Sequence, residues 1–318
     1  MEFPGFDGNE QLKQNLSAAV DRRQPSHFYL ISGPVGSGKR TLARVLSAAL
    51  LCQSGEHRPC GRCRHCRKVY SGNHPDLITV DDEEHKTIPV ALIRQARSDL
   101  FIRPNEAERK IYYVPRGQDL GIPGQNALLK VLEEPPGYGV FILLTDNPDK
   151  LLPTVRSRCT ELKLQPLEQE LLRVKLTEEF PQSDPQSIEA AICRSGGWLG
   201  QAKTLLSSGD FWLPETVTFS NCYGQKDHLS LLRLLVPMER MKRDQLIPIL
   251  TQWRELLASA LVCRSGLAPL DPLSRTLASG RTSRELTQAM DALEWGIRRL
   301  EGNISPGAVC GVLVWQLR

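Results

Sequence analysis

A glycine-rich segment of the sequence, Gly33-Pro-Val-Gly-Ser-Gly38-Lys39, contains the residue types that bind phosphate groups. It follows the apolar run 28–31 and precedes a helical pattern, which is the setting that a phosphate-binding loop requires. In such a loop the glycines let backbone N–H groups surround the phosphates, while the lysine reaches the outer ones. The candidate nucleotide-binding residues are therefore Gly33, Gly36, Gly38 and Lys39.

The residue after the lysine departs from this pattern. A Ser or Thr hydroxyl normally binds Mg²⁺ at that position, and this chain has Arg40 instead. Thr41 comes one residue later, so we expect it to project from a different side of the helix, and it is kept as a candidate binding residue. A glycine-rich turn that binds no ligand is the alternative interpretation.

The apolar run 111–114 predicts the strand that supplies the second half of such a site. Enzymes that hydrolyse nucleotides place a carboxylate at the end of this strand to hold Mg²⁺. This chain has Pro115 and Arg116 there, and Asp119 lies beyond the end of the strand. Because two ligands of one cation are missing, the sequence predicts a site that does not hydrolyse nucleotide.

Four cysteines lie close together with the spacing of a metal site: Cys52, Cys60, Cys63 and Cys66. Two-residue gaps let successive thiolates turn onto one ion, and four thiolates form a closed tetrahedral zinc site. A catalytic zinc needs an open coordination position, so this spacing predicts a structural zinc ion. His57 and His65 lie nearby in the sequence and are expected to be solvated.

Basic residues surround these cysteines: Arg58, Arg62, Arg64, Arg67 and Lys68. A run of this kind is usually a solvated face, and contact with nucleic acid is the alternative. A further arginine, Arg158, lies in the sequence Arg156-Ser157-Arg158-Cys159. It is either an ordinary surface charge or, in a ring of subunits, a finger that reaches a neighbour's γ-phosphate.

The elements that must position these residues follow from the apolar pattern. Over the first 165 residues, strands are predicted at 28–31, 77–80, 111–114 and 140–144, and helices at 40–52, 89–100 and 125–133. Short strands separated by helices imply a parallel sheet covered on both faces. The sequence therefore predicts an α/β P-loop domain over residues 1–165, with the cysteine module 52–66 inserted in it.

Strand signals stop at about residue 167, and helical patterns continue to the end of the chain. Helices are predicted at 167–180, 186–195, 199–207, from about 225, at 283–300 and at 306–318, with a connection at 268–276. Two helical faces are predicted from apolar spacing: one with Leu229, Leu232, Leu235 and Val236, and one with Trp253, Leu256, Leu257 and Ala260. We expect a small helical domain over 166–208 and an all-α domain over 209–318.

Composition narrows the class of protein. The 318 residues are 41% hydrophobic and 24% charged, with a net charge of +4, which is ordinary for a globular protein of two or three domains. No apolar run approaches the roughly 20 residues of a membrane span, and no signal-peptide pattern is present. Nine cysteines, four of them clustered, favour a metal site in the cytoplasm over a secreted disulfide framework.

Several segments together resemble the AAA+ subunits of the bacterial DNA polymerase III clamp loader: residues 3–10, 27–33, the four-cysteine insertion, 74–76, 126–135 and 157–159. The resemblance is close over residues 1 to about 205 and continues weakly to the C-terminus, where 299–303 and the final helix resemble a collar domain. It implies an AAA+ domain, a helical lid and a collar in a heteropentameric ring with gamma/tau and delta subunits. Through that complex it implies a sliding clamp and primer-template DNA as partners.

Within this family the gamma/tau subunit is the motor, and the delta-prime subunit is a stator without a working ATPase site. Gamma/tau-like chains carry Thr or Ser at position 40, Asp-Glu at 115–116 and a sensor arginine at the position of Gly200, and this chain has none of these. All three departures favour the delta-prime type. That resemblance implies that Arg158 acts in trans on a neighbour's ATP and that polymerase activity resides in another subunit, with ATP or ADP a possible ligand here.

Two other functions stay open at this point. One is an active clamp-loader ATPase of the gamma/tau type that recruits Asp119 or Glu133 for Mg²⁺. The other is a stand-alone zinc-dependent protein that binds nucleic acid through the basic run around Cys60 to Cys66.

Overall fold

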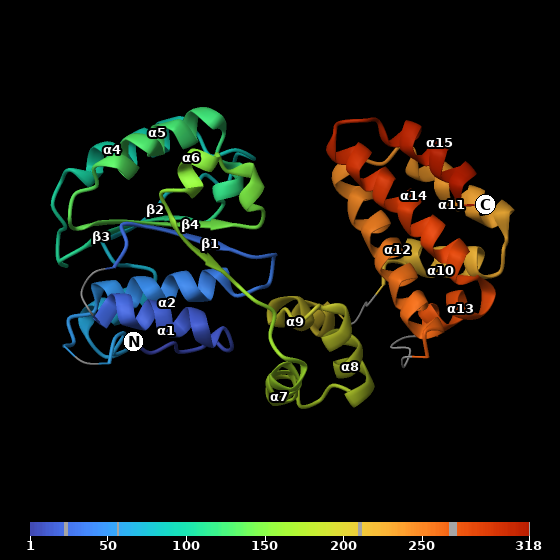
Figure 1. Ribbon diagram of the computed structural model, residues 1–318, viewed down its shortest axis with the longest axis horizontal. Helices are drawn as coiled ribbons and strands as arrows, with labels where there is room; N and C mark the ends of the chain where they lie inside the picture. The colour runs from blue at the N-terminus through green and yellow to red at the C-terminus, as the bar shows by residue number, and fades with distance from the viewer. Residues whose placement is uncertain (22–24, 56, 209–211, 267–271, 318) are drawn as a thin grey trace. The chain divides into compact units, whose positions relative to one another are not determined.

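The computed structural model describes residues 1–21, 25–55, 57–208, 212–266 and 272–317. The chain forms two compact units, which are considered separately (Figure 1). The first comprises Met1–Pro181 with Ser195–Thr204, and the second comprises Gln182–Arg194 with Leu205–Arg318.

A five-stranded parallel sheet forms the centre of the first unit, with the strand order β2-β3-β4-β1-β5. Its strands are β1 (Phe28–Ser32), β2 (Leu77–Thr79), β3 (Lys110–Val114), β4 (Gly139–Thr145) and β5 (Thr160–Lys163). The four strands predicted from apolar runs are confirmed. The sequence analysis missed β5, because this edge strand is largely exposed and only Leu162 is buried, which leaves no apolar run to detect.

Helices cover both faces of this sheet, as the parallel connections require. Figure 1 shows α1 and α2 on one side and α4, α5 and α6 on the other. Side chains alternate between the two cores: Tyr29 and Ile31 face the first pair of helices, whereas Phe28 and Leu30 face the others. The helical elements of this region are α1 (Glu10–Asp21), α2 (Lys39–Leu51), α3 (Arg64–Tyr70), α4 (Val90–Leu100), η1 (Gly117–Asp119), α5 (Ile122–Glu133), η2 (Pro148–Lys150) and α6 (Pro153–Arg156).

Three short helices follow the sheet: α7 (Gln169–Glu179), α8 (Pro185–Arg194) and α9 (Leu199–Ser208). They lie within a residue or two of the predicted bounds. Helix α7 and the beginning of α9 belong to the first unit, and α8 belongs to the second.

The rest of the second unit is a helical bundle around α12. Trp253 of this helix is fully buried and stacks on Phe219 of α10, with ring centroids 4.2 Å apart. Helix α12 is long and apolar enough to span a membrane by length and composition alone, but the predicted face from Trp253 to Ala260 is buried inside the bundle. The helices are α10 (Pro214–Gly224), α11 (His228–Met238), α12 (Arg243–Arg264), α13 (Pro272–Gly280), α14 (Ser283–Glu301) and α15 (Pro306–Gln316).

Two predictions for this bundle are wrong. Helix α11 buries Leu231, Leu235 and Met238, whereas Leu229 and Val236 are exposed. Leucine occurs on every side of this helix, so apolar spacing could not select the buried face. The connection predicted at 268–276 is helical from residue 272 onward, and residues 267–271 and 318 lie outside the described part of the chain.

Candidate functional site

The glycine-rich loop connects β1 to α2, at the carboxyl edge of the sheet where parallel α/β folds bind their ligands. Gly36 has φ 79° and Gly38 has φ 92°, which is backbone that favours glycine. Gly38 caps α2 in this left-handed conformation, and Lys39 is the first residue of the helix. The structure therefore places the sequence-predicted loop residues, Gly33 included, in one turn.

Lys39 is held by contacts inside the protein. Its Nζ donates hydrogen bonds to the carbonyl oxygens of Gly33 (2.6 Å) and Pro34 (2.7 Å). It also lies 2.6 Å from Oδ1 of Asp146, which follows the end of β4. The sequence analysis did not identify Asp146, although a carboxylate just past the end of a strand is the signal that could have found it.

The loop makes direct backbone contact with the start of α9. Gly200 N donates to Gly36 O at 2.9 Å, and Gln201 Nε2 donates to Val35 O at 2.8 Å. A Cβ atom on Gly200 would lie 2.7 Å from Gly36 Cα, a distance that real Cβ atoms essentially never adopt. In this arrangement position 200 therefore has no room for a side chain.

A cleft of 270 Å³ adjoins the loop. Phe6 and Trp198 contribute its aromatic lining, and Thr41, Lys203 and the loop residues from Gly36 to Gly38 contribute polar groups. Arg40 does not line this cleft but a second one, on another side of α2. Arg40 thus lines only the second cleft, whereas Thr41 lines both.

Arg116, at the end of β3, is held by the loop that follows β2. Its guanidinium donates to Asp81 Oδ1 at 2.9 and 2.7 Å and to the carbonyl oxygens of Asp82, His85 and Lys86. These hydrogen bonds to Asp81 raise the pKa of Arg116 above its ordinary value. Asp119 Oδ2 lies 3.5 Å from the same guanidinium, so both carboxylates next to the end of β3 are paired with Arg116.

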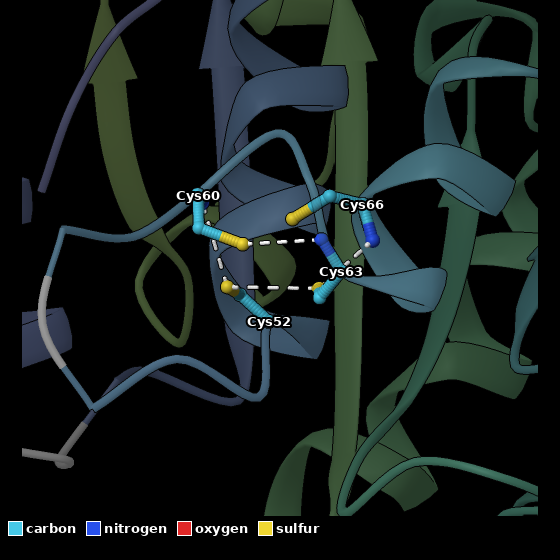
Figure 2. Close-up of side chains that lie close together, drawn as sticks. All are labelled: Cys52, Cys60, Cys63 and Cys66. Carbon is cyan, nitrogen blue, oxygen red and sulfur yellow. Dashed lines mark hydrogen bonds between the residues drawn. The ribbon is translucent and has the colours of Figure 1, made fainter.

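The four predicted cysteines come together at the end of α2 and the start of α3. Their Sγ atoms all lie within 4.8 Å of one another, and Figure 2 shows the sulfurs directed toward a common point. Four sulfurs bound to zinc at about 2.3 Å are roughly 3.8 Å apart, close to the 4.0 Å between Cys52 and Cys63. The cluster therefore fits a tetrahedral zinc ion.

Backbone N–H groups around the cluster favour thiolates, the form that binds metal. Amides of Cys60, Cys63 and Cys66 donate to the sulfurs of Cys52, Cys60 and Cys63 at 3.4–3.5 Å. The N–H groups of Cys63 and Arg62 lower the pKa of Cys60 to about 6, whereas burial raises the pKa of Cys66.

Of the two histidines near this cluster, only His57 is solvated. The prediction for His65 is wrong: its ring is fully buried, and Nδ1 lies 2.7 Å from Nε2 of His74, which is also buried. This pair was not predicted, because His65 lies on the buried face of α3 and its partner His74 lies in the loop that follows.

Arg158 lies in the turn after α6 and has a 41% exposed side chain. It donates to Thr154 O at 3.1 Å, and its Nη2 is 3.8 Å from Glu133 Oε1. Arg156 is held more firmly, by Asp149 Oδ1 at 3.0 Å, with Glu161 Oε2 at 3.7 Å. Burial raises the pKa of the Cys159 thiol to about 12, so this cysteine is a packing residue.

Comparisons with known proteins agree with one another. The model of the family described as "DNA polymerase III, delta subunit" matches residues 8–168. The delta' subunit of Bacillus subtilis is 34% identical over 164 residues (52% of this chain, 50% of its own), and that of Pseudomonas aeruginosa is 35% identical over 183 residues (55% and 54%). The tau subunit of Salmonella typhimurium is 28% identical over 323 residues, which cover 96% of this chain. The chain spans about half the length of these relatives.

Proposed function

The chain belongs to the DNA polymerase III delta subunit family of clamp-loader proteins, and from this premise we propose that it is a non-hydrolysing, delta-prime-type stator. In this role it helps load the sliding clamp onto primed DNA as part of a ring with gamma/tau and delta subunits. It supplies Arg158 to the ATP of a neighbouring subunit.

The observation that carries the proposal is that neither position expected to hold Mg²⁺ has a residue that can bind it. Arg40 stands where a hydroxyl is needed, and Arg116 stands beside Pro115 where carboxylates are needed. Asp81 fixes Arg116 in place, so the guanidinium cannot easily give way to a cation. Gly200 adds a third change, because its backbone packs on Gly36 where a sensor arginine would need space.

The two arginines of the Arg156–Cys159 turn support a role for the second one. Arg158 is the more exposed, and its ion pair with Glu133 is long at 3.8 Å. A guanidinium held this weakly can be redirected to a phosphate with little loss. Arg156, with its shorter ion pair to Asp149, serves as the matched control.

Further parts of the proposal concern organisation and cofactors. We assign residues 1–165 to an AAA+ domain, 166–208 to a lid and 209–318 to a collar that joins the heteropentamer in the cytoplasm. The four cysteines would hold one structural zinc ion. Gly33, Gly36, Gly38, Lys39 and Thr41 would form a degenerate nucleotide site, which ATP or ADP can occupy only if Lys39 leaves Asp146.

Clamp loading by the reconstituted ring tests the proposal. A cation from the next subunit stabilises the charge that develops on the γ-phosphate, and such trans-acting fingers contribute roughly 10³ to 10⁵ in rate in GTPases. Other interfaces keep their own fingers, so we expect Arg158→Ala to lower ATP-dependent loading by less than this while the ring still assembles. Arg156→Ala should have a smaller effect. Wild-type loading by Arg158→Ala would refute the role of this arginine.

An active ATPase of the gamma/tau type is the second candidate. It is favoured by the similarity to a tau subunit over 96% of this chain and by the intact Gly33, Gly38 and Lys39. Asp119 and Glu133 would have to leave Arg116 and Arg158 to serve as magnesium ligands. ATP turnover by the isolated chain that is abolished by Lys39→Ala would establish this function in place of the stator.

A further inference from the structure

A second cleft, which we call the α2–β3 cleft, lies on the side of α2 reached by Arg40. It has a volume of 340 Å³, within the range of small-molecule sites. Helix α2 contributes Arg40, Arg44 and Ser47, and the strands contribute Thr79 and Tyr113. Val69 and Leu77 are among the apolar residues of its wall, and none of the described residues that line it is acidic.

Two arginines dominate the charge of this cleft. Arg40 and Arg44 are four residues apart on α2, so their side chains share one face of the helix. Among the described residues, neither side chain makes an ion pair or a hydrogen bond, although the Arg44 guanidinium lies 5.8 Å from the Tyr70 ring. Like charges at this spacing destabilise a helix unless an anion neutralises them.

Tyr113 adds a hydroxyl donor beside the arginines, whereas the Ser47 hydroxyl already donates to Ala43 O at 2.8 Å. Burial raises the pKa of Tyr113, so its hydroxyl keeps its proton at neutral pH. Asp81 also raises this pKa, and its carboxylate is already bound to Arg116. Arginine forks and hydroxyl donors beside an apolar wall are the groups that bind phosphate oxygens.

We propose that the α2–β3 cleft binds a phosphate-bearing anion, with Arg40 and Arg44 as its charged ligands and Tyr113 as a neutral donor. This site differs from the cleft at the glycine-rich loop, because Gly36 and Gly38 line only that other cleft, although Thr41 lines both. Replacing the magnesium-binding hydroxyl by Arg40 thus turns a position that binds a cation in ATPases into one that binds an anion. The inference does not depend on the stator role.

Calorimetric titration of the full chain with inorganic pyrophosphate at low ionic strength tests this site. Charged hydrogen bonds of this kind change affinity by roughly tenfold or more, so Arg40→Gln and Arg44→Gln should each weaken binding by about that factor. Arg40→Lys should restore part of it, and Tyr113→Phe should cause a smaller loss. A competing single-stranded oligonucleotide of thymidines distinguishes a nucleic-acid backbone, which would displace pyrophosphate, from a free small anion; either source supports the site.

Two controls can overturn the inference. Lys39→Ala removes the charge of the glycine-rich loop, and Arg67→Gln removes an exposed arginine of α3 that does not line the cleft. Arg67→Gln should bind pyrophosphate as the wild type does, and the loss of affinity in Lys39→Ala should be smaller than that in Arg40→Gln or Arg44→Gln. Equal loss in Lys39→Ala would place the anion in the loop, and equal loss in Arg67→Gln would indicate a diffuse basic surface. Absence of pyrophosphate binding by the wild-type chain would also refute the site.

Discussion

The contact between Gly36 and Gly200 predicts that alanine at position 200 destabilises the first unit. A Cβ atom there would lie 2.7 Å from both Cα and O of Gly36. To reach ordinary contact at about 3.5 Å, the two backbones must separate by roughly 0.8 Å. That shift would also break the 2.9 Å hydrogen bond from Gly200 N to Gly36 O.

The magnitude follows from three contributions. Overpacking of a tight contact costs about 1–3 kcal/mol, and loss of one hydrogen bond adds about 1 kcal/mol. Replacing a helical glycine by alanine recovers up to about 1 kcal/mol. We therefore expect Gly200→Ala to lower the free energy of unfolding by about 1–3 kcal/mol.

Gly124 provides a matched control in the same unit. It also lies in the first turn of a helix, α5, but a Cβ there would meet its nearest neighbour, the Leu120 side chain, at 3.6 Å, an ordinary contact. Gly124→Ala should be neutral or stabilise by up to about 1 kcal/mol. Urea denaturation measures both variants, and hydrogen exchange in residues 33–46 assigns the change to the loop. Equal stability of the two variants would refute the reasoning.

Two further predictions concern the same unit. The buried Asp76 carboxylate accepts hydrogen bonds from the backbone N–H groups of Asn105, Glu106 and Ala107; burial raises its pKa, but these bonds hold it below its ordinary value. Asp76→Asn should therefore lower the free energy of unfolding at pH 7 by about 2–4 kcal/mol, measured by urea denaturation. The difference from the wild type should shrink as the pH falls below about 4, because Asp76 then binds a proton more tightly in the unfolded chain than in the folded one. A difference that does not change with pH would contradict this reasoning. Cys63→Ser should abolish the stoichiometric zinc found by elemental analysis and make residues 52–66 sensitive to protease. Circular dichroism should still show the folded sheet. Wild-type protein that contains no zinc after purification under reducing conditions would contradict the metal site.

The apolar pattern of the sequence was sufficient to predict the inner strands of the first unit but not its edge strand β5. Strands β1 and β4 are buried at every residue, and each contains an uninterrupted apolar run, 28–31 and 140–144. Strand β5 pairs with β1 through its backbone, and most of its side chains are exposed. Backbone pairing leaves no trace in residue types, so such a strand is found only once its neighbour is placed.

The residues of the candidate site were also predicted only in part from the sequence. Local motifs located the glycine-rich loop and the four cysteines, because each set lies within a few turns of chain. The partners that decide the state of the site are remote in sequence: Asp146 holds Lys39, and Asp81 holds Arg116. Spacing along the chain carries no information on such pairs.

Arg116 and Gly200 each make contacts that stabilise the structure around them. Arg116 does more than remove a carboxylate, because it ties the end of β3 to the loop after β2 through Asp81. Gly200 does more than remove an arginine, because only a residue without a side chain lets α9 donate its N–H to Gly36. Both residues therefore stabilise the fold of this unit. Replacing either residue would break these contacts, so we expect it to lower the stability of the unit whatever its effect on nucleotide binding.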